Sequence, residues 1–140
     1  MIVKIKRLHP EAKLPSYAHP GDVGMDMYSL EDYTLQPGEL KIFFTGFALE
    51  FEPGYAAIVK DKSSVGGKGV HCVGGVFDAG YRGEYNVGLI NLTKEPFIIA
   101  KGQKIAQLVL FPVIIATLEE TSELSDSSRG AGGFGSTGKF

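Results

Sequence analysis

The chain has 140 residues, 44% of them hydrophobic and 21% charged, with a formal net charge of −2 and one cysteine. This composition predicts a single globular domain. The single cysteine excludes an intrachain disulfide, and the net negative charge argues against a basic surface for a nucleic-acid polymer. No apolar run in the sequence is long enough to cross a membrane. Because the N-terminus also lacks the apolar core of a signal peptide, we expect a soluble cytoplasmic protein without membrane or nucleic-acid partners.

Short runs of alternating or β-branched apolar residues predict an all-β chain. Turn signals such as the Pro-Gly pairs at 37–38 and 53–54 separate these runs, and no window keeps a helical period. This pattern favours a β-sandwich or distorted jelly roll over a sheet of βαβ units. In chain order, we expect strands at residues 2–8, 23–28, 40–51, 55–60, 70–73, 75–78, 84–92, 97–100 and 104–118.

The C-terminal residues differ in character from the rest. A stretch rich in serine and acids at 121–128 precedes a glycine-rich tail that also carries Arg129 and Phe134. Glycine loses much backbone entropy on ordering and adds no packing surface, so we expect a flexible arm at 121–140 beside a β domain at 1–120. An arginine suits a phosphate and an aromatic ring suits a flat base. These features favour a lid over a nucleotide, and a frayed terminus is the plainer alternative.

Two nucleotide-binding patterns in this tail are coincidental. Residues 130–135 match G-x-G-x-x-G, but no strand leads closely into them as the dinucleotide-binding turn requires. Residues 133–139 match G-x-x-x-x-G-K, but Phe140 stands where a P-loop has its magnesium-binding Ser or Thr.

Candidate functional side chains lie in several segments of the expected β domain. Asp26 is either an outward-facing strand residue or a carboxylate that holds magnesium beside a polyphosphate. The segment 61–69 has the short donors, glycines and lysines of a phosphate loop, although an ordinary solvated loop has them too. Gln107, in the last expected strand, is either an outward polar residue or an amide donor to phosphate.

The segment 74–83 predicts a glycine-rich hairpin. Its Asp78 is either a turn residue or a carboxylate that activates water in a pocket. Gly74 and Gly75 would let a flat ligand approach the backbone, and Tyr81 could stack beneath that ligand. The three histidines and Cys72 lack the spacing of metal ligands.

The order and spacing of these segments resemble the homotrimeric dUTPase family. The blocks at 24–29, 62–65, 75–83, 101–108 and 129–138 follow the arrangement of that family, and the third and fifth are the most diagnostic. The resemblance implies a jelly-roll homotrimer that uses Mg²⁺ to hydrolyse dUTP to dUMP and pyrophosphate. This reaction limits uracil in DNA and supplies dUMP for dTMP synthesis. Each site would be assembled from three chains, with the tail and the hairpin coming from different subunits.

The resemblance also assigns roles to residues. Asp78 matches the general base that activates water for attack on the α-phosphorus, and Tyr81 matches the residue that packs on deoxyribose. Asp26 would support Mg²⁺ mostly through coordinated water. The expected phosphate donors are Lys62, Ser63, Ser64 and Gln107, and the hairpin backbone at Gly75, Val76 and Phe77 would read uracil. In the tail, Arg129 would bind the γ-phosphate and Phe134 would cover uracil. The further expected tail contacts are Gly135, Ser136 and Thr137.

Two blocks depart from the usual residues of the family. The segment 61–66 replaces Pro-Arg-Ser-Gly-Leu-Ala, so Lys62 keeps the charge of an arginine without its bidentate fork. Gln103 and Lys104 replace Asp-Arg, so the sequence leaves open whether the fourth block forms an ion pair. The Ser63-Ser64 pair also suits a dCTP deaminase, or a bifunctional deaminase and dUTPase, of the same fold. A non-catalytic β-sandwich module is a second alternative. The hairpin and the complete tail favour the dUTPase.

Overall fold

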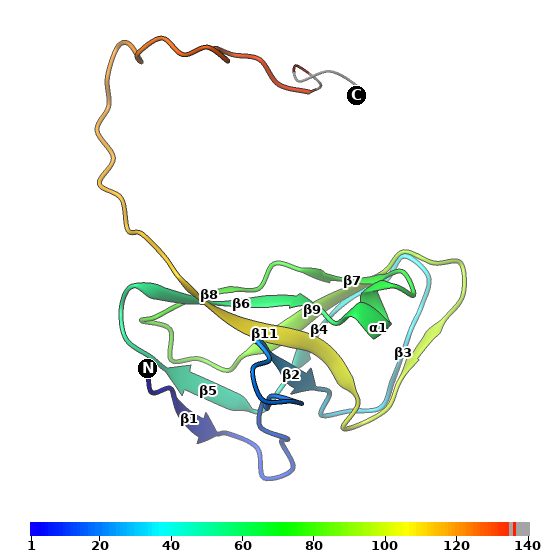
Figure 1. The fold of residues 1–140 in the computed structure, drawn as a ribbon. Coiled ribbons are helices and arrows are strands. Elements are labelled where there is room, and N and C mark those ends of the chain that lie inside the picture. The colour runs from blue at the N-terminus through cyan, green and yellow to red at the C-terminus, as the bar shows by residue number, and fades with distance from the viewer. Residues whose placement is uncertain (135, 137–140) are drawn as a thin grey trace.

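A computed structural model describes residues 1–134 and residue 136, and its elements are almost all strands (Figure 1). One helical turn, α1 (Ser63–Gly66), accompanies them. Among the described residues, no helix has the length and apolarity that a membrane crossing needs. The strands are β1 (Lys4–Arg7), β2 (Gly24–Tyr28), β3 (Tyr33–Leu35), β4 (Leu40–Phe44), β5 (Phe47–Glu50), β6 (Tyr55–Asp61), β7 (Val70–Val73), β8 (Val76–Asp78), β9 (Asn86–Asn91), β10 (Phe97–Ile99) and β11 (Lys104–Pro112).

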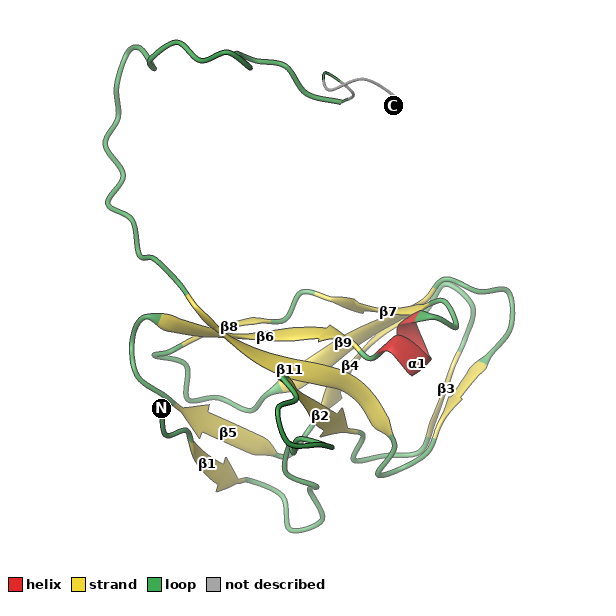
Figure 2. Ribbon diagram, in the orientation of Figure 1, coloured by secondary structure: helices red, strands yellow, loops and turns green. Residues whose placement is uncertain are grey.

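The strands pair antiparallel into two main sheets and two small ribbons. The larger sheet has the order β2-β11-β6-β8, and the smaller has the order β4-β9-β7. β1 pairs with β5, and β10 pairs with β3. Figure 2 shows strands wrapped around one body with almost no helix, which confirms the expected distorted jelly roll.

Side chains from both main sheets form one hydrophobic core. Met27 and Leu108 enter it from the larger sheet, while Phe43 and Leu89 enter it from the smaller, and all four are fully buried. Because neighbouring side chains of a strand point to opposite faces, strands such as β5 and β9 contribute alternate residues to this core, Phe47 and Leu49 from the first and Val87 and Leu89 from the second. The core therefore fixes the register of the strands that carry the candidate site residues.

The expectation of one strand over residues 40–51 was wrong. The chain breaks between β4 and β5 at Gly46, which has a φ of +76°. A Cβ on Gly46 would lie 2.6 Å from the Cβ of Ala12, so only glycine fits this corner. The short strand β3 was not expected, because three residues are too few to show an alternating pattern.

The last strand is also shorter than expected. β11 ends at Pro112 rather than at residue 118, and the backbone N–H of Val113 donates to the carbonyl oxygen of Gly54 at 2.8 Å. Beyond it, Ile114 is 95% exposed and Leu118 is 93% exposed. Within the described residues this segment has no partner strand, and it runs away from the body (Figure 1).

Candidate active site

The segment expected to bind phosphate begins where β6 ends. Lys62 has an extended backbone, with φ −75° and ψ 127°, and precedes the single turn of α1. Its carbonyl oxygen accepts hydrogen bonds from the N–H groups of Val65 and Gly66, both at 2.8 Å. Ser63 and Ser64 form the start of this turn, whose first N–H groups have no acceptor within the turn itself. The helical turn forms despite the neighbouring glycines, because Val65 is anchored in the core.

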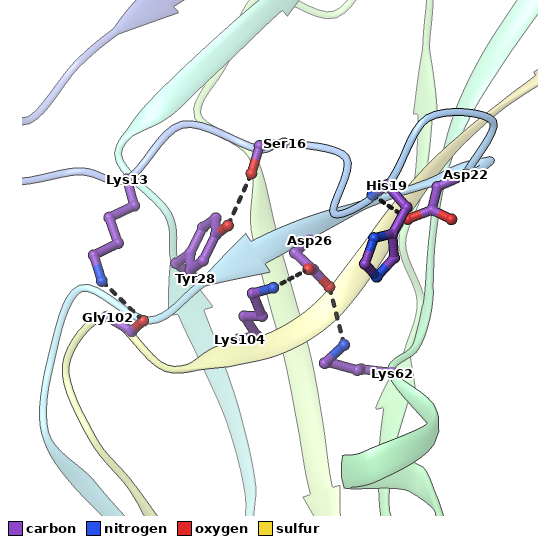
Figure 3. A network of polar contacts seen from close by, with 9 residues as sticks. All are labelled: Lys13, Ser16, His19, Asp22, Asp26, Tyr28, Lys62, Gly102 and Lys104. Atoms are coloured by element: carbon purple, nitrogen blue, oxygen red, sulfur yellow. Dashed lines mark hydrogen bonds and ion pairs between the residues drawn. The ribbon is translucent and has the colours of Figure 1, made fainter.

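Asp26 lies at the centre of a charged network beside this turn (Figure 3). Its side chain on β2 is 2% exposed, and its two oxygens bind different lysines. Lys62 Nζ lies 3.1 Å from Oδ1, and Lys104 Nζ lies 2.6 Å from Oδ2. The ion pair that the fourth block left open is therefore present, with lysine in place of arginine. The sequence could have indicated this ion pair, because Lys104 keeps the positive charge of the arginine that the family usually has at this position.

The network shifts the pKa of its members. Burial acts to raise the pKa of Asp26, but the hydrogen bonds from Lys104 and Lys62 outweigh it, and the pKa is lowered. The hydrogen bond to Asp26 raises the pKa of Lys104. At neutral pH, the group is thus one buried carboxylate held between two ammonium groups.

Gln107 lies next to the same network. On β11 it is in register with Asp26 on one side and with Lys60 on the other. A Cβ on Gly24 would lie 3.1 Å from Gln107 Cδ, so this glycine leaves room for the amide side chain. The structure therefore brings together the expected acid and the expected phosphate donors: Asp26, Lys62, Ser63, Ser64 and Gln107.

These residues do not form a magnesium site by themselves. Among residues 1–134 and 136, no group of three or more His, Cys, Asp or Glu side chains could hold a metal ion. Both oxygens of Asp26 are bound by lysines, whereas Mg²⁺ prefers several oxygen ligands and retains water. With both oxygens held by lysines, Asp26 suits contact with the water shell of an ion better than direct coordination.

The second group of expected residues lies on β8 and the turns beside it. Gly74 and Gly75 have φ values of +71° and +95°. A Cβ on Gly75 would lie 2.8 Å from the Cβ of Val59, so the backbone packs too closely for any other residue. Val76 and Asp78 are exposed while Phe77, between them, is buried. The expected uracil-binding backbone and the expected base thus lie on the open face of one short strand.

Tyr81 is held rigidly beside Asp78. Its N–H donates to the carbonyl oxygen of Asp78 at 3.0 Å, and its hydroxyl donates to the carbonyl oxygen of Glu84 at 3.1 Å. The ring lies over Gly83, where a Cβ would be 2.3 Å from the tyrosine oxygen. It also packs 5.5 Å from the ring of Phe77. Tyr81 is 38% exposed, so it offers a fixed flat surface to a ligand.

One chain does not bring these two groups together. Asp78 pairs with Ala56 near the start of β6, whereas Asp61 at the other end of β6 leads into the phosphate loop. At about 3.3 Å per residue, β6 rises about 16 Å between those two residues. The expected base and the expected phosphate donors therefore lie at opposite ends of the larger sheet.

The tail lies apart from both groups. Arg129 Nε donates to the carbonyl oxygen of Gly132 at 3.0 Å, and Phe134 is fully exposed. Figure 2 shows this segment extending away from the strands. Ser136 donates its N–H to the carbonyl oxygen of Gly133 at 3.3 Å, whereas the expected contacts Gly135 and Thr137 lie outside the described residues.

Comparison with known proteins gives one consistent answer. The dUTPase family model matches residues 10–138. The deoxyuridine 5'-triphosphate nucleotidohydrolase of Clostridium tetani is 45% identical over 140 residues, covering 98% of this chain and 97% of that protein. The enzyme of the same name from Nautilia profundicola is 46% identical over 142 residues, covering 99% of this chain and all of that protein.

A solved structure agrees with these sequences. The dUTPase of Staphylococcus bacteriophage 80alpha, in a structure with dUPNHPP, superposes with a TM-score of 0.87 at 29% identity. The alignment covers 98% of each chain. The chain therefore belongs to the dUTPase family, the enzymes that hydrolyse dUTP to dUMP and pyrophosphate, as the five sequence blocks predicted.

Proposed function

We propose that this enzyme hydrolyses dUTP with Asp78 as its general base. The carboxylate of Asp78 accepts a proton from water as the water oxygen attacks the α-phosphorus. The bond from that phosphorus to the bridging oxygen breaks, and pyrophosphate leaves while dUMP stays on the hairpin. The observation that carries this proposal is an exposed carboxylate on β8, beside a rigid tyrosine and a glycine backbone open to a flat base.

The hairpin supplies the recognition of the nucleoside. The backbone of Gly75, Val76 and Phe77 would pair with the edge of uracil, because no side chain stands between that backbone and the ligand at Gly75. Tyr81 would pack on deoxyribose and leave no space for a 2′-hydroxyl. A tightly approaching backbone also rejects the extra methyl group of thymine.

The network around Asp26 supplies the recognition of the triphosphate. Lys62, with the donors of Ser63, Ser64 and Gln107, would bind phosphate oxygens. Magnesium, which accompanies the triphosphate, would neutralise part of its charge. Asp26 would contact the water shell of that ion and hold Lys62 and Lys104 in place.

We infer that the working site is shared between subunits of a homotrimer. The separation of about 16 Å along β6 means that Asp78 and Lys62 of one chain cannot serve one α-phosphate together. Each site would take the hairpin from one chain and the phosphate donors from another. Apolar side chains exposed on β4 offer surface for such contacts, namely Leu40, Ile42 and Phe44 at 52%, 42% and 54% exposure.

The arm would complete the site as a lid. Residues 121–128 would act as a linker from the β domain, and the tail would close over substrate bound by other subunits. Arg129 would bind the γ-phosphate and Phe134 would cover uracil, with Ser136, Gly135 and Thr137 as further contacts. We place this enzyme in the cytoplasm.

Pyrophosphate release from dUTP, dCTP, dTTP and UTP, with and without Mg²⁺, tests this proposal. We expect rapid turnover of dUTP alone and a strong loss of rate without the metal. Release of ammonia from dCTP would instead identify the deaminase of the same fold. An absence of turnover with every nucleotide would support a non-catalytic module.

A further inference from the structure

The last residue of β6 makes two bonds to β7 that the usual residue of the family cannot make. Asp61 Oδ1 accepts the N–H of Cys72 at 2.6 Å, and Oδ2 lies 2.7 Å from Nδ1 of His71. Burial acts to raise the pKa of Asp61, but the bonds from the Cys72 backbone and His71 outweigh it, and the pKa is lowered. Because an ionised carboxylate only accepts hydrogen bonds, Nδ1 of His71 carries the proton and donates it. A proline at position 61 would accept neither bond.

Asp61 also fits the turn that follows it. A Cβ on Gly66 would lie 3.1 Å from Asp61 Cβ and 3.2 Å from Oδ2. The usual pattern has proline at position 61 and alanine at position 66, whereas this chain has an acid at the first and no side chain at the second. The two departures are therefore complementary, because the carboxylate lies against the space that an alanine methyl would need.

The turn depends on such anchors. A helix of four residues is marginal by itself, and the glycines that follow α1 add backbone freedom. Val65 is the one buried residue of α1, and Lys62 has no side-chain cap. The link from Asp61 to β7 is thus a second anchor, directly before Lys62 and Ser63.

We propose that the Asp61–His71 pair positions the phosphate-binding loop for the triphosphate, an inference that rests on the proposed function of Lys62 and Ser63. The pair ties the end of β6 to β7 directly before the loop. It therefore holds the donors of the loop in one orientation without touching the substrate. Both residues act through Lys62 and Ser63 and are positioning residues.

The test compares ligands with and without the outer phosphates. In Asp61→Ala, we expect the KM for dUTP and the Kd of a non-hydrolysable α,β-imido dUTP to rise about tenfold, the effect of losing one or two hydrogen bonds. The Kd of dUMP and the kcat should change by less than about twofold, because the hairpin is unaltered. His71→Phe should show a smaller effect of the same kind. Asp61→Asn should restore most of the affinity, because its oxygen accepts from Cys72 and its amide donates to the unprotonated ring.

Controls separate this pair from general loss of structure. Glu52→Ala removes an acid at a turn away from the loop and should leave both affinities unchanged. Equal weakening of dUMP and imido-dUTP binding, or no weakening of either, would overturn the proposal. If Asp61→Ala does not fold, His71→Phe tests the proposal by the same comparison of the Kd of imido-dUTP with the Kd of dUMP. Failure of the wild-type protein to hydrolyse dUTP would instead refute the proposed function. The two Kd values are measured without turnover, so the two failures can be told apart.

Discussion

At the scale of single residues, the proposed site contains two acids in opposite environments. Asp26 is buried between two lysines, while Asp78 is exposed on a short strand. A general base must reach a water and accept its proton, which an exposed carboxylate can do. A carboxylate whose oxygens are both bound by ammonium groups organises charge instead. The different roles that we assign to the two acids follow from this contrast.

Asp78→Asn should abolish hydrolysis while nucleotide binding persists. An amide cannot accept the proton of the attacking water, and general bases contribute about 10²–10⁴-fold to rate. We therefore expect kcat to fall by at least about a hundredfold, with the Kd of imido-dUTP within about threefold of wild type. Stopped-flow pyrophosphate release and calorimetry measure the two quantities. Undiminished turnover in this variant would remove Asp78 from the mechanism.

The Asp26 network should make stability depend on pH. A carboxylate whose pKa is lowered on folding stabilises the protein above its unfolded pKa of about 3.9, and this contribution is lost as the pH falls through the folded value. Asp26→Asn leaves two lysines without their partner and should cost about 2 kcal/mol at pH 7. The difference from wild type should shrink as the pH falls below about 4. Urea unfolding at several pH values measures it, and a difference that stays constant would contradict the network.

At the scale of elements, glycines with positive φ determine where strands can meet. Gly75 and Gly54 have nearly equal φ values of +95° and +90°. A Cβ on Gly75 would meet Val59 at 2.8 Å, whereas a Cβ on Gly54 would meet nothing within 4 Å. Alanine substitutions at these two glycines can therefore distinguish the backbone strain of an added side chain from the effect of close packing.

Gly75→Ala should be more damaging than Gly54→Ala. Both variants pay the strain of a left-handed residue, about 1–2 kcal/mol. Only Gly75→Ala must also push β8 away from β6, so we expect it to lose about 1–2 kcal/mol more in the free energy of unfolding. Its KM for dUTP should rise as well, because the hairpin moves. Denaturant unfolding and steady-state kinetics measure both effects, and equal losses in the two variants would contradict the packing argument.

The sequence predicted those elements whose cause is local. The bounds of β7, residues 70–73, follow from two valines that enclose His71 and Cys72 between flanking glycines. The break at Gly46 could not be predicted, because it depends on Ala12, which is distant in the sequence. The end of β11 was missed for a related reason. Apolar residues continue after Pro112, but their pattern does not say whether a partner strand lies beside them.

At the scale of the whole molecule, the order of the sequence blocks predicted the family, and it also named most of the residues that the structure gathers. The network of Asp26 with Lys104 was only an open question, since it requires the register between β2 and β11. The separation of Asp78 from Lys62 was likewise invisible in the sequence, because it depends on the register that sets Asp78 opposite Ala56, near the start of β6. That separation supports the proposal that each site is shared between subunits.

Mixing two inactive variants tests the shared site directly. A chain that ends after Ser128 should fold, because the strands end at Pro112, and it should lose most activity with the lid. Asp78→Asn keeps the tail and lacks the base. If hairpin and tail come from different subunits, co-refolding equal amounts should restore about a quarter of the wild-type rate, since each part is intact at half of the sites. If both parts of a site came from one chain, no mixture would exceed the separate variants. Sedimentation of the same samples checks that the trimers have formed.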